Sequence, residues 1–373
     1  MYHFLLAFVL VGWVSMSTAQ SATTAFYIGT YTSPTGSQGV YRATLDLETG
    51  KVSEAVLAGT TKNPSFLAIH PNKPVLYAAL EIGELNGVKT GGVAAFAIGA
   101  DGMLKPLGEA QGSGGQGPCY VSVDASGKFA LVANYGGGSV AALPIADDGS
   151  LSPAITVDKH AGSGPNPKRQ QGPFAHSIVA APGAGFVLSA DLGTDKIYVY
   201  QLDSAHALTP AAAPSVPVDP GDGPRHIALH PNGKFVYVVT ELTNHVIAFA
   251  WTGATLKRIG KTPTLPADFT GQTTSAEIAV HPNGKFLYSS NRGHDSIAAF
   301  KIADDGTLTP AGHTQTGGQQ PRHFAIDPTG QYLLAANQKT DNIVVFKINP
   351  DGSLTPTGST IKIDAPVCVR FVP

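Results

Sequence analysis

The sequence predicts an all-β fold, a seven-bladed β-propeller in which each blade is a four-stranded antiparallel sheet. Two segments alternate along the 373 residues, and each pair recurs after roughly 45 to 55 residues. Four short strands at that spacing are typical of a propeller blade. The 43 Gly, 28 Pro and only 13% charged residues agree, because they favour short strands joined by tight turns.

The first recurring segment is a hairpin, which residues 223–242 show most clearly. Arg225 and His226 open an apolar strand, HPNGK forms a turn, and residues 235–241 alternate as a second strand. The turn sets the register, so we expect Arg225 roughly opposite Glu241, at the end away from the turn. Further copies lie at residues 63–81, 117–135, 172–192, 274–292 and 320–338.

The second recurring segment supplies the third and fourth strands of each blade, and several copies contain an Asp-Gly hairpin turn. Clear copies lie at residues 92–106, 139–153, 296–310 and 342–356, and looser copies at 39–54, 196–210 and 245–259. The chain ends with APVCVRFVP, a first strand without a partner, and AFYIGTYT near the N-terminus reads like the missing second strand. We therefore expect one propeller domain, residues 20–373, whose last blade pairs the two ends of the chain.

Residues 1–19 are expected to be a signal peptide. An apolar run from Phe4 to about Val14 is followed by small residues that end at Ala19, the usual pattern before a cleavage site. The alternative is a short membrane anchor, but the run is shorter than the ~20 residues of a span. We expect a periplasmic or secreted protein with no membrane span after cleavage.

Composition limits the possible partners. A net charge of −2 provides no basic surface, so nucleic acid is not an expected partner. The cysteines Cys119 and Cys368 are too few for a disulfide scaffold. No clustered Cys and His set and no phosphate-loop glycine pattern occurs, so we expect neither a metal nor a cofactor. The sequence carries no signal for an oligomeric state.

The repeat also predicts where chemistry can lie. First strands of the blades line the central channel, so their ends, with the facing ends of the second strands, form a ring at one channel mouth. The positions equivalent to Arg225 and Glu241 are Ser65 with Glu81, Cys119 with Tyr135, His176 with Leu192, Ala276 with Arg292, Arg322 with Gln338, and Val367 with Tyr31. Structural positions should look alike from blade to blade, and these differ. The alternative is that the charged members are ion pairs between blades.

Recurring polar residues are interpreted as structural. His70, His230 and His281 occupy the same HPN turn position in three blades. The asparagines just before the ring position, Asn134, Asn291 and Asn337, are expected to bond local backbone, and Asn337 could also face the ring.

Several motifs resemble one family. They are FYIGTYT near the N-terminus, GPFAHSI at 172–178, GPRHIALHPNGKFVYVVTEL at 223–242, FLYSSNRGHDSI at 286–297 and QPRHFAID at 320–327. With them the chain resembles the seven-bladed propeller lactonases, which include bacterial 6-phosphogluconolactonases of the propeller type and fungal carboxy-muconate cyclases. The resemblance implies four catalytic residues, which are His176, Arg225, Glu241 and Arg292. The neighbouring ring positions are expected to bind substrate, and they are His226, Arg322, His323, Gln338 and Glu81.

The implied activity is the hydrolysis or formation of a lactone on an anionic sugar-acid or muconate-type substrate. Opening a lactone needs a base for water and donors for the developing oxyanion. Glu241 or His176 can be the base, while Arg225 and Arg292 can bind an anionic group and stabilise the oxyanion. Expected export is at odds with phosphorylated gluconolactone, a cytosolic intermediate. The alternatives are a non-catalytic propeller that binds an anionic carbohydrate and a protein-interaction scaffold.

Overall fold

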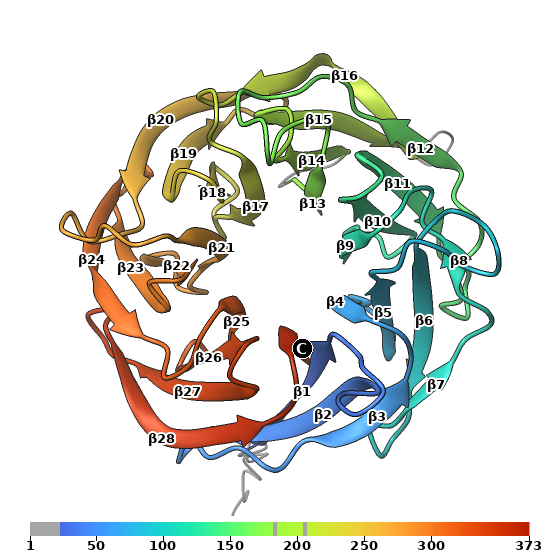
Figure 1. Cartoon of the computed structure of the whole chain (residues 1–373), viewed down its shortest axis with the longest axis horizontal. Helices are drawn as coiled ribbons and strands as arrows, with labels where there is room; N and C mark the ends of the chain where they lie inside the picture. The colour runs from blue at the N-terminus through green and yellow to red at the C-terminus, as the bar shows by residue number, and fades with distance from the viewer. Residues whose placement is uncertain (1–22, 182–184, 204–206, 373) are drawn as a thin grey trace, which may run out of the picture.

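The computed structural model describes residues 23–181, 185–203 and 207–372, and these residues contain strands and turns but no helix. Seven antiparallel sheets stand around a central channel (Figure 1), so the predicted propeller is confirmed. Each sheet has four main strands, and in six of the sheets these strands follow one another in chain order from the channel to the rim. The predicted signal peptide, residues 1–19, lies outside the described residues.

Six blades consist of strands that are consecutive in the sequence. The first two blades consist of β4 (Pro64–Ile69), β5 (Val75–Leu80), β6 (Gly92–Ile98) and β7 (Leu104–Pro106), with the short β8 (Gln111–Gly112) paired to β6, and of β9 (Pro118–Val123), β10 (Phe129–Asn134), β11 (Ser139–Pro144) and β12 (Thr156–Lys159). The next two consist of β13 (Ala175–Ala180), β14 (Phe186–Asp191), β15 (Lys196–Asp203) and β16 (Ala207–Pro217), and of β17 (Pro224–Leu229), β18 (Phe235–Thr240), β19 (His245–Trp251) and β20 (Leu256–Pro263). The last two of the six consist of β21 (Thr274–Val280), β22 (Phe286–Arg292), β23 (Ser296–Ile302) and β24 (Leu308–Gln315), and of β25 (Pro321–Ile326), β26 (Tyr332–Asn337), β27 (Asn342–Ile348) and β28 (Leu354–Lys362).

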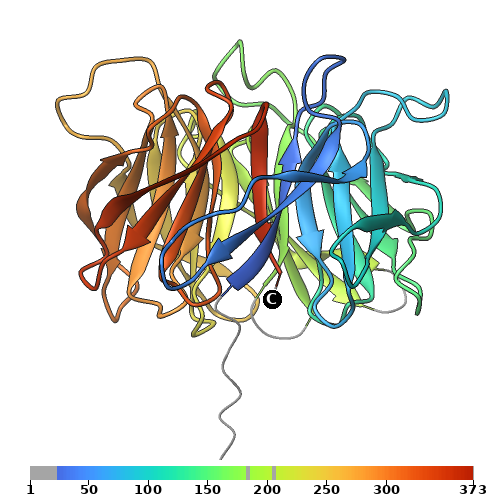
Figure 2. The ribbon, with the colours of Figure 1, turned by 90° about the horizontal axis from the view of Figure 1, so that it is seen from below.

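The seventh blade joins the two ends of the chain, as the sequence predicted. Its strand order is β29 (Pro366–Phe371), β1 (Thr23–Thr30), β2 (Gly39–Asp46) and β3 (Val56–Thr60). Figure 2 shows β29 in red beside β1 in blue, and the two strands pair from Phe26 with Phe371 onward. Because β1 bonds to both neighbours, it leaves no free edge at the point of closure.

Each innermost strand has a β-bulge near the channel mouth. In β17, Pro224 pairs with Thr240 and His226 pairs with Val239, so Arg225 is an extra residue and has no ladder partner. The residues left out of the ladder in the other blades are Ser65, Cys119, His176, Ala276 with Glu277, Arg322 and Val367. These include every first-strand ring position predicted from the repeat. A bulge re-aims side chains, and three of these residues, Cys119, His176 and Arg322, line a cavity at the channel mouth.

Histidines of the HPN turns link neighbouring blades. Nε2 of His70, His230 and His281 lies 2.8–3.0 Å from a carbonyl oxygen in the equivalent turn of the next blade. Their predicted structural role is confirmed. The asparagines also bond backbone, because Nδ2 of Asn134 and Asn291 donates to the carbonyls of Ser113 and Thr264. These partners are 21 and 27 residues away, so the expected local bond was wrong.

Candidate active site

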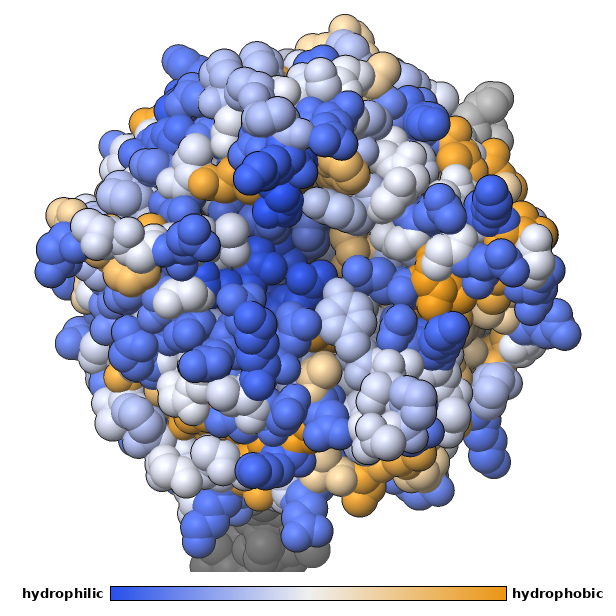
Figure 3. Space-filling view, viewed as in Figure 1, coloured by the Kyte–Doolittle hydropathy of each residue, from blue (hydrophilic) through white to orange (hydrophobic). Residues whose placement is uncertain are grey.

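A polar cavity of about 310 Å³ opens at the mouth where the innermost strands begin. Figure 3 shows this face, with hydrophilic side chains around a central hollow. Residues from all seven blades contribute to the lining, which consists of Tyr31, Glu81, Cys119, Tyr135, Arg169, His176, Glu241, Thr274, Arg292 and Arg322. All of them except Arg169 and Thr274 are ring positions predicted from the repeat. A wider vestibule of about 780 Å³, which shares Arg169, Thr274 and Arg292, adjoins this cavity.

Glu241 is the electrostatic centre of the cavity. Its Oε2 lies 2.9 Å from Nε of Arg225 and 3.0 Å from Nη2 of Arg292, and its Oε1 accepts from Nη2 of Arg169. Burial raises the pKa of Glu241, but the charges of Arg292 and Arg225 outweigh burial and hold this pKa well below its usual range. Glu241 is therefore a carboxylate whose oxygens are already occupied.

His176 lies beside this carboxylate as a neutral imidazole. Its Nε2 is 4.0 Å from Oε2 of Glu241, and its Nδ1 is 3.5 Å from Sγ of Cys119. Burial, together with the charge of Arg225, lowers the pKa of His176 well below 6.5. A neutral imidazole can accept a proton, and the nearby carboxylate would stabilise the imidazolium that forms.

The opposite wall of the cavity carries Arg322. Its guanidinium lies over the Tyr31 ring, 5.5 Å from the ring centre, and the nearest carboxylate oxygen described, Oε2 of Glu81, is 3.9 Å away. The Tyr31 hydroxyl donates to that same oxygen at 2.9 Å. Arg322 therefore has weaker pairing than the arginines around Glu241.

Charge in and directly beneath the cavity is unbalanced. Four guanidinium groups face two carboxylates, which leaves a net charge of about +2; these groups are Arg169, Arg225, Arg292, Arg322, Glu81 and Glu241. A site of this composition favours an anionic ligand.

Some residues predicted for the site lie elsewhere. Arg225 is only 1% exposed and sits beneath Glu241, so it does not line the cavity. His226 and His323 are deeper in the channel, where both contact Glu277. Gln338 is half-buried outside the cavity lining, and its backbone amide donates to the carbonyl of Gln320. Aligning the repeated hairpins identified the ring of residues at the channel mouth, but it could not tell which side chains line the cavity and which lie deeper in the channel.

Arg169 was missed because it has no equivalent in other blades. It lies in the connection from Lys159 to Ala175, the longest between blades in the described part of the chain. Gln170 anchors this loop, since its Nε2 donates to the Leu192 carbonyl at 2.8 Å and to Asp195 at 2.7 Å. The length of this connection was the available signal, because long loops at a channel mouth often carry binding residues.

Buried histidines should make stability fall in acid. Burial lowers the pKa of His176 and His226 well below 6.5 and that of His323 to about 3. Unfolding restores the ordinary pKa, so the unfolded state binds more protons below about pH 6.5, and each histidine costs up to about 1.4 kcal/mol of unfolding free energy per pH unit. Urea midpoints measured from pH 7.5 to pH 4.5 should fall with pH. A constant midpoint would contradict the neutral buried state.

The family model described as "Lactonase, 7-bladed beta-propeller" matches residues 25–371. The chain belongs to the seven-bladed β-propeller lactonase family. The 6-phosphogluconolactonase of Bacillus subtilis is 39% identical to this lactonase over 350 residues, which are 93% of this chain and 97% of that protein. The resemblance inferred from the motifs is confirmed, and the activity of this protein is lactone hydrolysis.

Two solved structures support the assignment of this lactonase. A putative 6-phosphogluconolactonase from Bacteroides fragilis has a TM-score of 0.87 and 34% identity, covering 95% of this chain and 99% of that one. The Pseudomonas aeruginosa periplasmic gluconolactonase PpgL has a TM-score of 0.88 and 30% identity, covering 94% and 99%. In the described residues of this lactonase, no helix has the length and hydropathy of a membrane span.

Proposed function

We propose that this lactonase hydrolyses the lactone of a sugar acid that carries an anionic group. The supporting observation is the excess of four guanidinium groups over two carboxylates at the mouth cavity. The predicted signal peptide, and the periplasmic neighbour from Pseudomonas aeruginosa, support an extracytoplasmic location, which cell fractionation tests.

His176 is the proposed general base. Glu241 is a weak base because three arginines bind its oxygens, whereas the neutral imidazole of His176 lines the cavity. His176 takes a proton from water as the hydroxide oxygen bonds to the lactone carbonyl carbon. The carbonyl oxygen becomes an oxyanion, and Arg292 stabilises it from the cavity wall. This intermediate collapses, the ring C–O bond breaks, and the imidazolium returns the proton to the leaving alkoxide.

Arg322 is the proposed ligand for the anionic group of the substrate. Replacing it with alanine removes charged hydrogen bonds worth about 1.5–3 kcal/mol, so KM for 6-phosphogluconolactone should rise roughly 10- to 150-fold, with a smaller change in kcat. KM for uncharged gluconolactone should stay within about twofold, because that substrate has no anionic group to lose. A pH-stat measures both rates above spontaneous hydrolysis.

Arg258 is the matched control, because it is an exposed arginine paired with Asp219 on the outer part of the molecule. Arg258→Ala should change neither KM. If Arg322→Ala raises KM equally for both lactones, Arg322 does not bind the anionic group. If the unmodified protein hydrolyses gluconolactone faster than 6-phosphogluconolactone, the substrate is a neutral lactone and the proposed function is wrong.

A further inference from the structure

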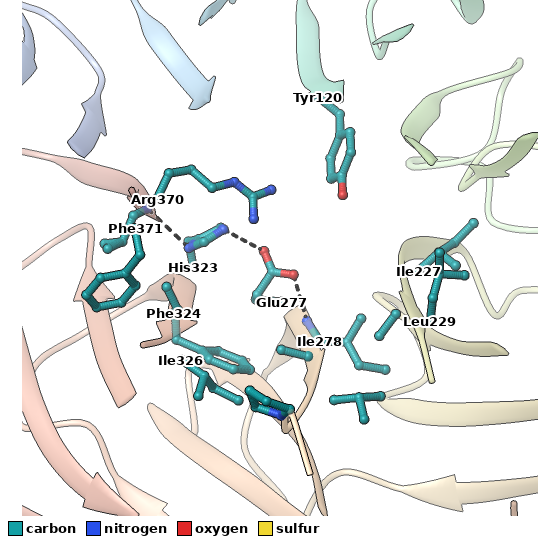
Figure 4. A pocket seen from close by; sticks show the side chains of 16 residues that line it. Tyr120, Ile227, Leu229, Glu277, Ile278, His323, Phe324, Ile326, Arg370 and Phe371 are labelled. Atoms are coloured by element: carbon teal, nitrogen blue, oxygen red, sulfur yellow. Dashed lines mark hydrogen bonds and ion pairs between the residues drawn. The ribbon is translucent and has the colours of Figure 1, made fainter. Parts of the chain in front are cut away.

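A second buried polar cluster lies below the mouth cavity and consists of His226, Glu277 and His323. Oε2 of Glu277 lies 3.1 Å from Nδ1 of His226 and 3.1 Å from Nε2 of His323, and its Oε1 accepts from the Ile278 amide at 2.9 Å. Figure 4 shows Glu277 projecting toward His323 and Arg370 in the cavity of about 390 Å³ at the opposite end of the channel. Glu277 therefore has every carboxylate oxygen occupied by a donor.

His226 connects this cluster to the mouth. Its Nε2 lies 3.1 Å from Nη1 of Arg225, and Nε of the same guanidinium lies 2.9 Å from Oε2 of Glu241. A guanidinium can only donate, so Nε2 of His226 must be the acceptor and its proton must be on Nδ1. An ionised carboxylate can only accept, and Glu277 lies at Nδ1. The contacts are consistent with one tautomer of a neutral His226.

We propose that Glu277 is a positioning residue of this lactonase: it fixes the His226 tautomer that holds Arg225, and Arg225 in turn holds the Glu241 carboxylate beside His176. This inference rests on the proposed function, in which Glu241 stabilises the imidazolium of His176. Arg225 is only 1% exposed and makes one further bond, from Nη1 to the Ala276 carbonyl at 2.7 Å. Its orientation thus depends on few partners, and His226 is one of them.

Glu277→Gln tests the proposal because a glutamine side chain has one acceptor oxygen and cannot accept from all three donors of Glu277, which are His226, His323 and the Ile278 amide. If its amide nitrogen faces Ile278, a side-chain N–H donor meets the backbone N–H donor of Ile278. If the nitrogen faces the histidines, His226 must move its proton to Nε2, which then points a donor at the Arg225 guanidinium, itself a donor. We expect kcat to fall roughly 10- to 100-fold, as for partners that orient metal ligands, with KM changed less than threefold. Glu109→Gln, an exposed carboxylate far from the channel, is the control for lost charge and should leave kcat unchanged.

A double-mutant cycle separates positioning from general destabilisation. His226→Phe removes the contacts of His226 with both Glu277 and Arg225. In that background, Glu277→Gln should therefore cause no further decrease in kcat per folded molecule. Independent losses that multiply in the double variant would overturn the proposal. So would a Glu277→Gln variant that melts at lower temperature but keeps kcat within twofold.

Nitrogen NMR of the histidine rings gives a readout that needs no substrate and can be measured on any variant that still folds. His226, assigned by comparison with His226→Phe, should show its proton on Nδ1 in the unmodified protein, and Glu277→Gln should shift it toward Nε2 and reduce the exchange protection of the Arg225 Nε proton. If Glu277→Gln does not fold, Glu277→Asp, which keeps the charge but shortens the side chain, should show the same shift in part. If the proton of His226 is on Nε2 in the unmodified protein, the proposed contacts from Glu277 through His226 and Arg225 to Glu241 are wrong. Absence of lactone turnover with the Nδ1 proton present would instead count against the proposed function.

Discussion

Replacing His176 with alanine should lower kcat by roughly 100- to 10,000-fold, the usual contribution of a positioned general base. The cavity should otherwise persist, because the strand backbone on either side of this bulge pairs with β14. Glu241 cannot substitute for the lost base, since its pKa is held well below the usual range and its oxygens bind three arginines. Initial rates in a pH-stat, normalised to folded protein, measure the loss.

His230→Ala is the matched control for this experiment. His230 lies at the turn end of its blade, where Nε2 is 2.8 Å from the Gly284 carbonyl of the next blade. Its loss should lower the melting temperature and leave kcat per folded molecule intact. If His176→Ala retains more than a tenth of the rate while His230→Ala loses it, the base does not lie in the mouth cavity.

A chain that begins at Tyr31 and so lacks β1 should not form a stable propeller. The second strand of the closing blade disappears, which exposes the edges of β29 and β2 and removes three fully buried side chains, Phe26, Tyr27 and Ile28. Each such side chain contributes about 1.5–3 kcal/mol, and the lost ladder bonds add to this sum. The total is comparable with the whole stability of a typical domain, about 5–15 kcal/mol.

Differential scanning calorimetry tests this closure. A chain that begins at Thr23 keeps β1 and is the control, and it should melt at the temperature of the full-length protein. We expect the chain that lacks β1 to show no cooperative transition and to associate through its exposed strand edges. A shared melting temperature in the two truncated chains would contradict closure by pairing of the two ends.

Much of the site was predictable because the repeat allows equivalent positions of the seven blades to be compared with one another. The ring positions vary in residue type around the seven blades, and five of the predicted site residues at these positions line the mouth cavity: Glu81, His176, Glu241, Arg292 and Arg322. Arg169 escaped this comparison because its loop has no counterpart. Glu277 was within reach of the same comparison, because it aligns with His226 and His323 directly after the ring position, but its carboxylate was not singled out.

The sequence by itself determined the seven blades, their closure by the two ends of the chain and the ring of variable positions at one mouth. These features follow from local periodicity and from turns, whose physics acts over a few residues. Only the tertiary structure decided how deep in the channel each side chain lies. The consecutive residues Arg225 and His226 contact different carboxylates, Glu241 at the mouth and Glu277 deeper in the channel, and Glu277 comes from the neighbouring blade. Side-chain direction at a bulge depends on contacts between blades about fifty residues apart, and no local pattern encodes such contacts.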